Sequence, residues 1–233
     1  MFAMISVVIP AHNEAKRIAG TVNASMKALS GTCEVIVVDD SSDDDTSEKA
    51  QAAGAFVLRM QRRAGKGAAL MQGALNCGGD VVVFLDADIG ETAMEIPRLI
   101  EPIATDKADM TIARFPELNP LPRRGLGIVK LTAYWGVKQL CKSELSAILS
   151  GQRAARRCTF LNLMPFAPGF GVEVGLTIDA LRKGLRVIEV DCDMTHRVTG
   201  WNLAGFSHRS RQFCQIAKAI AARCVNRPGE NCL

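Results

Sequence analysis

The chain has 233 residues, 48% hydrophobic and 22% charged, enough apolar material for one large domain or slightly more. Its 28 basic and 24 acidic residues leave a scattered net charge of +4, which argues against nucleic acid as the main partner. Eight cysteines without CxxC pairs, and a start without a secretory leader, predict reduced thiols in a cytoplasmic protein. No apolar run reaches the roughly 20 residues that span a membrane, so we expect a soluble or at most peripheral protein.

The first part of the chain, residues 1–114, alternates short β-branched runs with segments of helical period, as in a parallel sheet covered by helices. Strands are predicted at Ile5–Ile9, Glu34–Asp39, Ala55–Leu58, Asp80–Leu85 and Asp109–Ala113. Helices are predicted over Glu14–Leu29, Thr46–Gly54 and Gly67–Cys77. The expected fold class is therefore α/β with a mainly parallel central sheet.

The second part begins after residues 115–125, which hold three prolines and are predicted to be a linker loop. Residues 126–226 are expected to complete the same domain, and residues 227–233 to be a tail. Helices are predicted over Leu126–Leu149, Cys158–Leu163 and Glu173–Arg182 and from Leu203 onward, with a strand over Leu185–Val190.

The strongest chemical signal is Phe84-Leu85-Asp86-Ala87-Asp88, two carboxylates at the end of a very apolar strand. Ligands of open α/β sheets collect outside the carboxyl ends of the strands. Hard cations such as Mg2+ take oxygen ligands from one or two carboxylates and from substrate phosphates. The pair indicates a metal that bridges the protein and a diphosphate; the alternative is a solvated turn after the strand.

Two more predicted strands end in polar loops, in Pro10-Ala11-His12-Asn13-Glu14 and in the acidic run from Asp39 to Thr46. Three polar strand ends at one edge of a sheet form a crevice. Within the acidic run, Asp43 and Asp45 are expected to be helix caps. The segment Gly65-Lys66-Gly67 opens a helix, where backbone N–H groups and a lysine suit a phosphate, although it is not a Walker A loop.

These four segments, in this order, resemble the pattern of glycosyltransferase family 2, which has the GT-A fold. The resemblance implies a metal-dependent glycosyltransferase with a UDP- or GDP-sugar donor and Mg2+ or Mn2+ as cofactor. It implies that residues 1–114 bind the nucleotide sugar and residues 126–226 the acceptor. By this resemblance the nucleotide contacts are Pro10, Ala11, Glu14, Asp40, Lys66 and Asp86, and the metal lies on Asp86 and Asp88.

Three later segments resemble those of polyprenyl-phosphate sugar transferases and glucosyl-phosphoglycerate synthases. Ser150-Gly151-Gln152-Arg153 resembles their Ser-Gly-x-Arg segment, which implies that Gly151 and Arg153 bind the acceptor. Residues 169–173 resemble their acceptor-side helix start and make Glu173 the candidate general base. Residues 194–200 resemble the segment that supplies a histidine as third metal ligand, which implies this role for His196; the alternative is a structural histidine at a strand end.

In the implied reaction, the metal held by Asp86 and Asp88 neutralises the leaving diphosphate, with added positive charge from Lys66 and Arg197. Asp88, Glu173 and Arg197 are therefore the predicted catalytic residues. An acceptor that carries a phosphate needs no general base if the phosphate itself attacks, whereas a hydroxyl needs one. The stereochemical outcome is left open.

The acceptor is expected to carry a phosphate, because Arg153, Arg156 and Arg157 follow the Ser150-Gly151 turn. The alternative is a solvated basic face. Both a lipid-linked phosphate and a small soluble phosphate are possible acceptors. The last helix either lies on an anionic membrane or covers the core. Its apolar side carries Phe206, Phe213, Ile216 and Ile220. Peripheral membrane contact and a homodimer are left open.

The sequence fits two other functions less well. A sugar-1-phosphate nucleotidyltransferase would need a glycine-rich loop after the first strand, and Pro10–Glu14 contains no glycine. A non-catalytic nucleotide-binding module on the same fold is disfavoured because Asp86, Asp88 and Lys66 are all present, and such charges are costly to hold together without a use.

Overall fold

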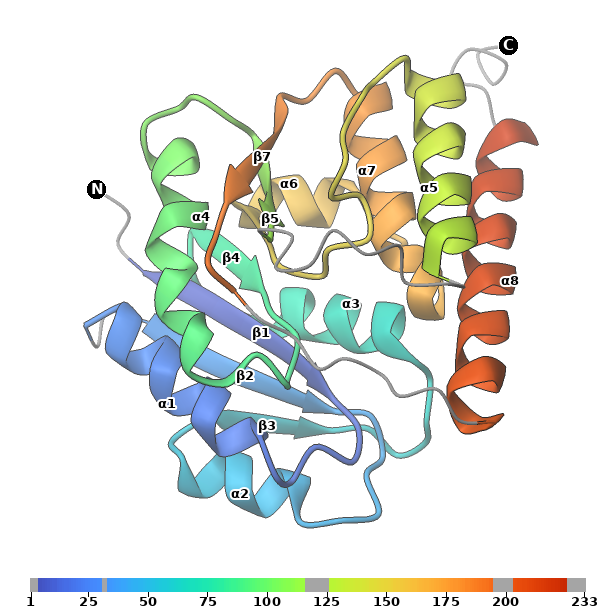
Figure 1. Cartoon of the computed structure of the whole chain (residues 1–233). Coiled ribbons are helices and arrows are strands. Elements are labelled where there is room, and N and C mark those ends of the chain that lie inside the picture. The colour runs from blue at the N-terminus through green and yellow to red at the C-terminus, as the bar shows by residue number, and fades with distance from the viewer. Residues whose placement is uncertain (1–3, 31–32, 116–125, 195–202, 226–233) are drawn as a thin grey trace, which may run out of the picture.

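The computed structural model describes residues 4–30, 33–115, 126–194 and 203–225. A seven-stranded sheet with the order β3-β2-β1-β4-β6-β5-β7 crosses the molecule, with helices on both faces (Figure 1). The strands are β1 (Ile5–Ala11), β2 (Cys33–Asp39), β3 (Phe56–Arg59), β4 (Val81–Phe84), β5 (Met110–Arg114), β6 (Arg153–Arg156) and β7 (Val187–Asp191). Only β6 runs antiparallel to its neighbours, so the mainly parallel α/β sheet is confirmed.

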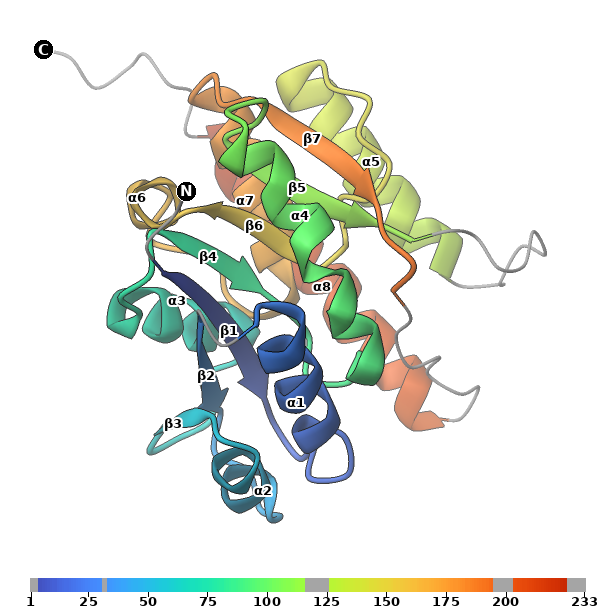
Figure 2. The ribbon, with the colours of Figure 1, turned by 90° about the vertical axis from the view of Figure 1, so that its left-hand side faces the viewer.

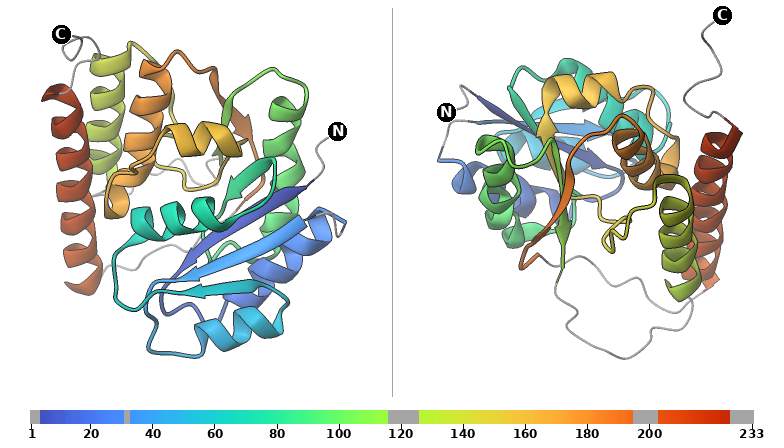
Figure 3. Two further views of the ribbon diagram at one scale, coloured as in Figure 1. Left: turned by 180° about the vertical axis from the view of Figure 1, so that it is seen from behind. Right: turned by 90° about the horizontal axis from the view of Figure 1, so that it is seen from above.

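The helices lie in two layers, with α1 and α4 on one face of the sheet and α3, α6 and α7 on the other (Figures 2 and 3). Their bounds are α1 (Ile18–Ala28), α2 (Thr46–Ala52), α3 (Lys66–Asn76), α4 (Ile96–Ala104), α5 (Leu126–Cys141), α6 (Arg157–Asn162), α7 (Val172–Arg182) and α8 (Leu203–Val225), with 3-10 turns η1 (Gly90–Glu95) and η2 (Gly169–Gly171). Helices α5 and α8 stand side by side beyond α7.

The first helix was predicted to begin at Glu14, but it begins at Ile18. The loop that precedes it forms hydrogen bonds with the loop after β2. The backbone N–H groups of Asn13 and Glu14 donate to Ser42 Oγ and Thr46 Oγ1, each at 2.9 Å. These donors therefore serve the contact with the loop after β2 instead of starting a helix.

Two elements were not predicted, and one helix is shorter than predicted. The two elements that were not predicted are helix α4 and strand β6. Helix α5 ends at Cys141 and not at Leu149, because Lys142 has a φ of 54°, a left-handed conformation that stops a right-handed helix. Strand β6 comes from the second part of the chain yet lies between β4 and β5, so the two parts share one sheet. Residues 116–125 of the predicted linker, 115–125, lie outside the described residues, and the division itself stays a prediction.

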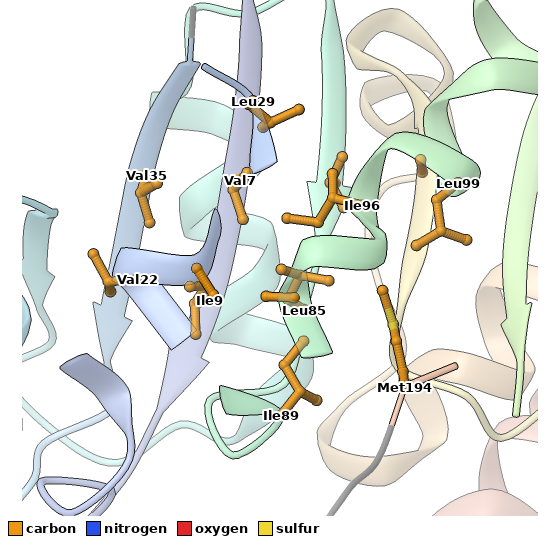
Figure 4. Close-up of a cluster of buried hydrophobic side chains, with 14 of the residues drawn as sticks. Val7, Ile9, Val22, Leu29, Val35, Leu85, Ile89, Ile96, Leu99 and Met194 are labelled. Atoms are coloured by element: carbon orange, nitrogen blue, oxygen red, sulfur yellow. The ribbon is translucent and has the colours of Figure 1, made fainter. Parts of the chain in front are cut away.

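The apolar interior has three clusters. The largest fills the space between the sheet and helices α1 and α4, around Val7, Ile9 and Leu99 (Figure 4). On the opposite face Phe84 and Phe160 stack with ring centroids 4.1 Å apart. The third cluster joins α5, α7 and α8; its members are Val129, Ala133, Val137, Ile148, Val174, Ile178 and Ile216. Helix α8 thus covers part of the apolar core, which is one of the two roles predicted for the last helix.

Candidate active site

The carboxyl ends of β1, β2 and β4 meet at one edge of the sheet, as the sequence predicted. The loops after β1 and β2 are joined directly. Asp40 N–H donates to Ala11 O at 2.8 Å, and Asp43 N–H donates to Asn13 Oδ1 at 2.9 Å. Pro10 and Ala11, the predicted base contacts, are the last residues of β1 and pair with Val38 and Asp39.

The two acids that end β2 are both engaged with backbone or hydroxyl donors. Asp39 is fully buried and accepts from Ser42 N–H at 2.9 Å and from the hydroxyl groups of Ser42 and Ser47. Asp40 accepts from the N–H groups of Ala64 and Gly65 at 2.7 and 2.8 Å. Asp40 therefore ties β2 to the loop that leads to Lys66. Its predicted contact with a nucleoside stays a prediction.

A charged cluster lies beside this edge and joins three residues that are far apart in the sequence. Lys66 Nζ lies 2.5 Å from Asp86 Oδ1 and 2.7 Å from Glu173 Oε1. The side chains of Lys66, Asp86 and Glu173 are 18%, 29% and 7% exposed. Burial on its own would lower the pKa of Lys66, but the two carboxylates outweigh it and hold the pKa above its ordinary value. Lys66 is therefore an ammonium ion at neutral pH.

Gln152 completes this cluster, and sequence analysis assigned it no role. Its Nε2 donates to Asp86 Oδ2 at 2.9 Å, and its Oε1 accepts from Ser150 Oγ at 3.1 Å. Gln152 is 1% exposed. The two oxygens of Asp86 are thus oriented from opposite sides, by an ammonium and by an amide.

The glycine between Ser150 and Gln152 faces the same cluster. A Cβ atom at Gly151 would lie 2.6 Å from Lys66 Nζ and 2.7 Å from either oxygen of Asp86. The absence of a side chain at Gly151 therefore allows the backbone to pack closely against Lys66 and Asp86. Gly67 is similarly confined, because a Cβ there would lie 2.1 Å from Ala167 O.

Arg153, a predicted acceptor contact, lies inside the protein and is 1% exposed. Its Nε donates to Ser150 O at 3.0 Å, Nη1 to Thr177 Oγ1 at 2.9 Å and Nη2 to Ile148 O at 2.6 Å. Burial lowers the pKa of Arg153 to about 10, while the neighbouring acidic side chains oppose the shift. The guanidinium holds the loop that carries Gly151; its contact with an acceptor stays a prediction.

The predicted cluster of three arginines is wrong, because Arg153 and Arg156 lie at opposite ends of β6 and Arg157 begins α6. In β6, Arg153 pairs with Phe84 at the carboxyl end of β4, whereas Arg156 pairs with Val81 at its start. Arg157 donates to Leu75 O at 3.3 Å, again at the far edge. Strand geometry, at about 3.4 Å per residue, thus separates side chains that are close in sequence.

The predicted metal site is described only in part. Asp86 and the partly buried Asp88 follow β4 at the crevice edge. Within the described residues no three histidine, cysteine or acidic side chains gather around one point. The predicted third ligand His196 and the predicted catalytic Arg197 lie in residues 195–202, outside those ranges. Glu14, a predicted nucleotide contact, has its carboxylate 3.5 Å from Arg17.

The donor chemistry of this edge nevertheless suits a hard cation. Asp86 and Asp88 are two carboxylates on one loop at the carboxyl end of β4. Carboxylate oxygens are the ligands that Mg2+ and Mn2+ take from a protein when a diphosphate supplies the other ligands.

Comparison with known proteins gives three consistent results. The sequence model described as "Glycosyl transferase family 2" matches residues 6–129. The glucosyl-3-phosphoglycerate synthase of Mycobacterium tuberculosis is 35% identical, over 97% of this chain and 74% of that protein. An undecaprenyl-phosphate 4-deoxy-4-formamido-L-arabinose transferase of Pseudomonas fluorescens is 29% identical, over 71% of this chain and 53% of that protein.

The comparison with solved structures agrees with the sequence comparisons. The glucosyl-3-phosphoglycerate synthase of M. tuberculosis, in complex with Mn2+, UDP and phosphoglyceric acid, superposes with a TM-score of 0.81 at 29% identity; the match covers 97% of this chain and 80% of that one. The same enzyme with Mn2+, UDP and glucosyl-3-phosphoglycerate gives a TM-score of 0.78 at 30% identity. The predicted GT-A fold is thereby confirmed.

Proposed function

Since the chain belongs to glycosyl transferase family 2, we propose that this glycosyltransferase moves glucose from UDP-glucose to a small phosphate-bearing acceptor of the phosphoglycerate kind, with Mn2+ or Mg2+ as cofactor. The near-complete overlap with glucosyl-3-phosphoglycerate synthases carries this proposal. One of these has been solved with Mn2+, UDP-glucose and phosphoglyceric acid bound together. The sugar-1-phosphate nucleotidyltransferase and the non-catalytic module receive no comparable support.

The charged cluster fits a diphosphate leaving group. When bound, the metal supplies positive charge to the diphosphate, and Asp86 and Asp88 would hold it. Lys66 adds a second cation at the same edge, delivered by a helix that starts at this residue, so backbone N–H groups face the same direction. Gln152 fixes the orientation of Asp86, and Gly151 allows the backbone to approach Asp86 closely. The arrangement is preorganised for the negative charge that develops as the glycosidic bond to phosphate breaks.

Glu173 stands as the candidate base for an acceptor hydroxyl. Its Oε1 lies 2.7 Å from Lys66 Nζ. A carboxylate that is paired with an ammonium ion is a weak base, so Glu173 acts as a base when Lys66 pairs with the diphosphate instead. We therefore assign Glu173 two linked tasks, holding Lys66 in place and accepting the proton of the acceptor hydroxyl.

A polyprenyl phosphate is the second candidate acceptor, because the chain is also 29% identical to the undecaprenyl-phosphate transferase over 71% of its length. The match covers little more than half of that relative, which is why the phosphoglycerate-type acceptor ranks first. A homodimer and cytoplasmic placement remain predictions.

The test is an assay of UDP release with UDP-glucose and three acceptors: 3-phosphoglycerate, undecaprenyl phosphate and a neutral sugar. Turnover with 3-phosphoglycerate that stops in chelator and returns with Mn2+ is expected. A melting-temperature panel supports the donor assignment, because a ligand at a hundredfold excess over its Kd stabilises a protein by about 2.7 kcal/mol. Transfer to the neutral sugar alone, or full activity in chelator, would refute the proposal.

A further inference from the structure

A groove of about 620 Å³ runs between α5 and α8, away from the nucleotide edge. Leu131, Trp135, Ile220 and Ala221 are among the side chains that line it. The two helices lie at the side of the molecule opposite β3 and α2 (Figures 1 and 3). The groove is therefore a surface separate from the crevice.

The same two helices carry most of the exposed apolar side chains. Within the described residues, five of the eight exposed large hydrophobic residues belong to them: Ile128, Leu131, Trp135, Phe213 and Val225, exposed by 65%, 56%, 48%, 37% and 80%. Ile128, Leu131 and Trp135 recur at intervals of three and four residues, so they form one stripe along α5. An apolar patch of this kind on a soluble domain marks an interaction site.

Charge on these helices has a single sign. Neither Leu126–Cys141 nor Leu203–Val225 contains an aspartate or glutamate. Lys130, Arg211 and Lys218 are exposed. Two further cations are neutralised by acids on other elements, Lys138 by a carboxylate at 2.9 Å after α5, and Arg223 by a carboxylate of α7. The net effect is an apolar stripe flanked by basic groups.

We propose that this α5–α8 face, defined by Ile128, Leu131, Trp135, Phe213 and Lys218, docks on the surface of an anionic lipid bilayer. Apolar side chains flanked by lysine and arginine suit the boundary between acyl chains and anionic headgroups. The tryptophan suits the same boundary, because its ring is apolar and its N–H is polar. In the described part of the chain no helix is long and apolar enough to span a bilayer, so the contact is peripheral.

A second copy of the chain fits the face less well. A twofold pairing would bring the same patch of each copy together and set basic groups against basic groups. Anionic headgroups instead offset these charges. Charge complementarity therefore selects the membrane as the occupant.

Docking would also place the active site near the lipid. Gln215 of α8 accepts the N–H of Phe170 at 2.8 Å, and η2 with Phe170 packs against α3, which begins with Lys66. The crevice would lie beside the bilayer without entering it. The proposal rests on the surface alone and is independent of the acceptor.

The experiment is vesicle flotation with the full chain, using neutral phosphatidylcholine vesicles and vesicles that also contain phosphatidylglycerol. We expect binding to the anionic vesicles only, weakened by salt because surface charges are screened. Leu131→Glu should reduce the bound fraction about tenfold, since it removes apolar burial and adds a repelled charge. Trp135→Ser is the second variant. Phe56→Glu is the matched control, because Phe56 is 61% exposed on β3, far from the face.

Melting curves and UDP-glucose turnover of each variant establish that it is folded. Absence of binding to anionic vesicles by the wild type would overturn the proposal, as would equal binding by Leu131→Glu. Analytical ultracentrifugation covers the remaining outcome. A dimer that Leu131→Glu dissociates, without vesicle binding by the wild type, would make the face a homodimer interface and also overturn it.

Discussion

The same grouping of charges, one cation between two carboxylates, occurs in two regions with different surroundings. In the active site, Lys66 lies between Asp86 and Glu173 and is 18% exposed. At the β5–β7 edge, Arg186 lies 3.0 Å from Asp106 and 2.9 Å from Asp109 and is 48% exposed. Buried charges lose their hydration and depend on their partners, whereas exposed ones keep most of it. Ion-pair distances alone therefore do not show how much a charged group contributes to stability; its burial must be known as well.

The largest expected effect comes from replacing Asp86, the proposed metal ligand of the buried group. Asp86→Asn should reduce turnover by about a hundredfold to a thousandfold, because it removes negative charge from the proposed metal site. Steady-state kinetics with UDP-glucose measures this. Asp106→Asn is the control at the exposed group and should retain wild-type turnover. Equal activity of the two variants would contradict the site assignment.

The next effect concerns stability. Lys66→Met should lower the free energy of unfolding by about 2–3 kcal/mol, because it leaves two mostly buried carboxylates close together without their cation. Arg186→Met removes the cation from the exposed group and should have a clearly smaller effect. Urea denaturation of both variants supplies the comparison. If both lost the same stability, burial would not be the deciding difference.

A third prediction tests how closely residue 151 must pack against the buried charged group. Gly151→Ala should lower turnover about tenfold or more, because its Cβ would meet Lys66 Nζ and Asp86 at 2.6 to 2.7 Å and displace groups set for reaction. Gly127→Ala is the matched control. Nothing lies within 4 Å of a Cβ at Gly127, in the first turn of α5, so that variant should stay active. Unimpaired turnover by Gly151→Ala would show that the close packing of residue 151 against Lys66 and Asp86 is not needed for activity.

The smallest expected effect is the pH dependence of stability at the exposed charged group around Arg186. The side-chain bond from Arg186 holds the pKa of Asp109 below its ordinary value. A lowered folded-state pKa adds stability above the ordinary value near 3.9, and this stability is lost as the pH falls further. Asp109→Asn should therefore melt slightly below the wild type at pH 7, and the difference should vanish in acid. A difference that persists at pH 2 would contradict this.

Much of the fold was predictable, because buried parallel strands appear as short apolar runs such as Val81–Phe84. Helix α4 was not predicted; it contains two prolines, Pro97 and Pro102, and proline inside a helix is usually unfavourable. Pro97 lies in the first turn, where its missing N–H costs nothing, and Ile96, Leu99 and Ile103 are buried on one side. Strand β6 was missed for another reason: four residues, Arg-Ala-Ala-Arg, carry no alternation, and their partners are remote in sequence.

The site was predictable as separate motifs but not as contacts. Lys66, Asp86 and Glu173 were each identified, whereas their mutual ion pairs depend on packing that no local pattern encodes. Gln152 was missed, since an amide beside a glycine has many structural uses. Arg153 was predicted to bind the acceptor, and its burial was not predicted, because arginine is rarely buried without partners. Its partners turned out to be two backbone carbonyls and a threonine, groups that sequence patterns do not reveal.

Strand β6 also constrains how the protein can be assembled on the ribosome. Strands β4 and β5 leave the ribosome early, but each has β6 as a neighbour, and β6 is synthesised much later. Until then the growing chain holds two strand edges without their partner, the kind of edge on which aggregation starts. A fragment that ends at Arg114 would keep these open edges permanently. The sheet beside the crevice is therefore complete only after Arg156 has been added, and the charged cluster around Lys66 only after Glu173.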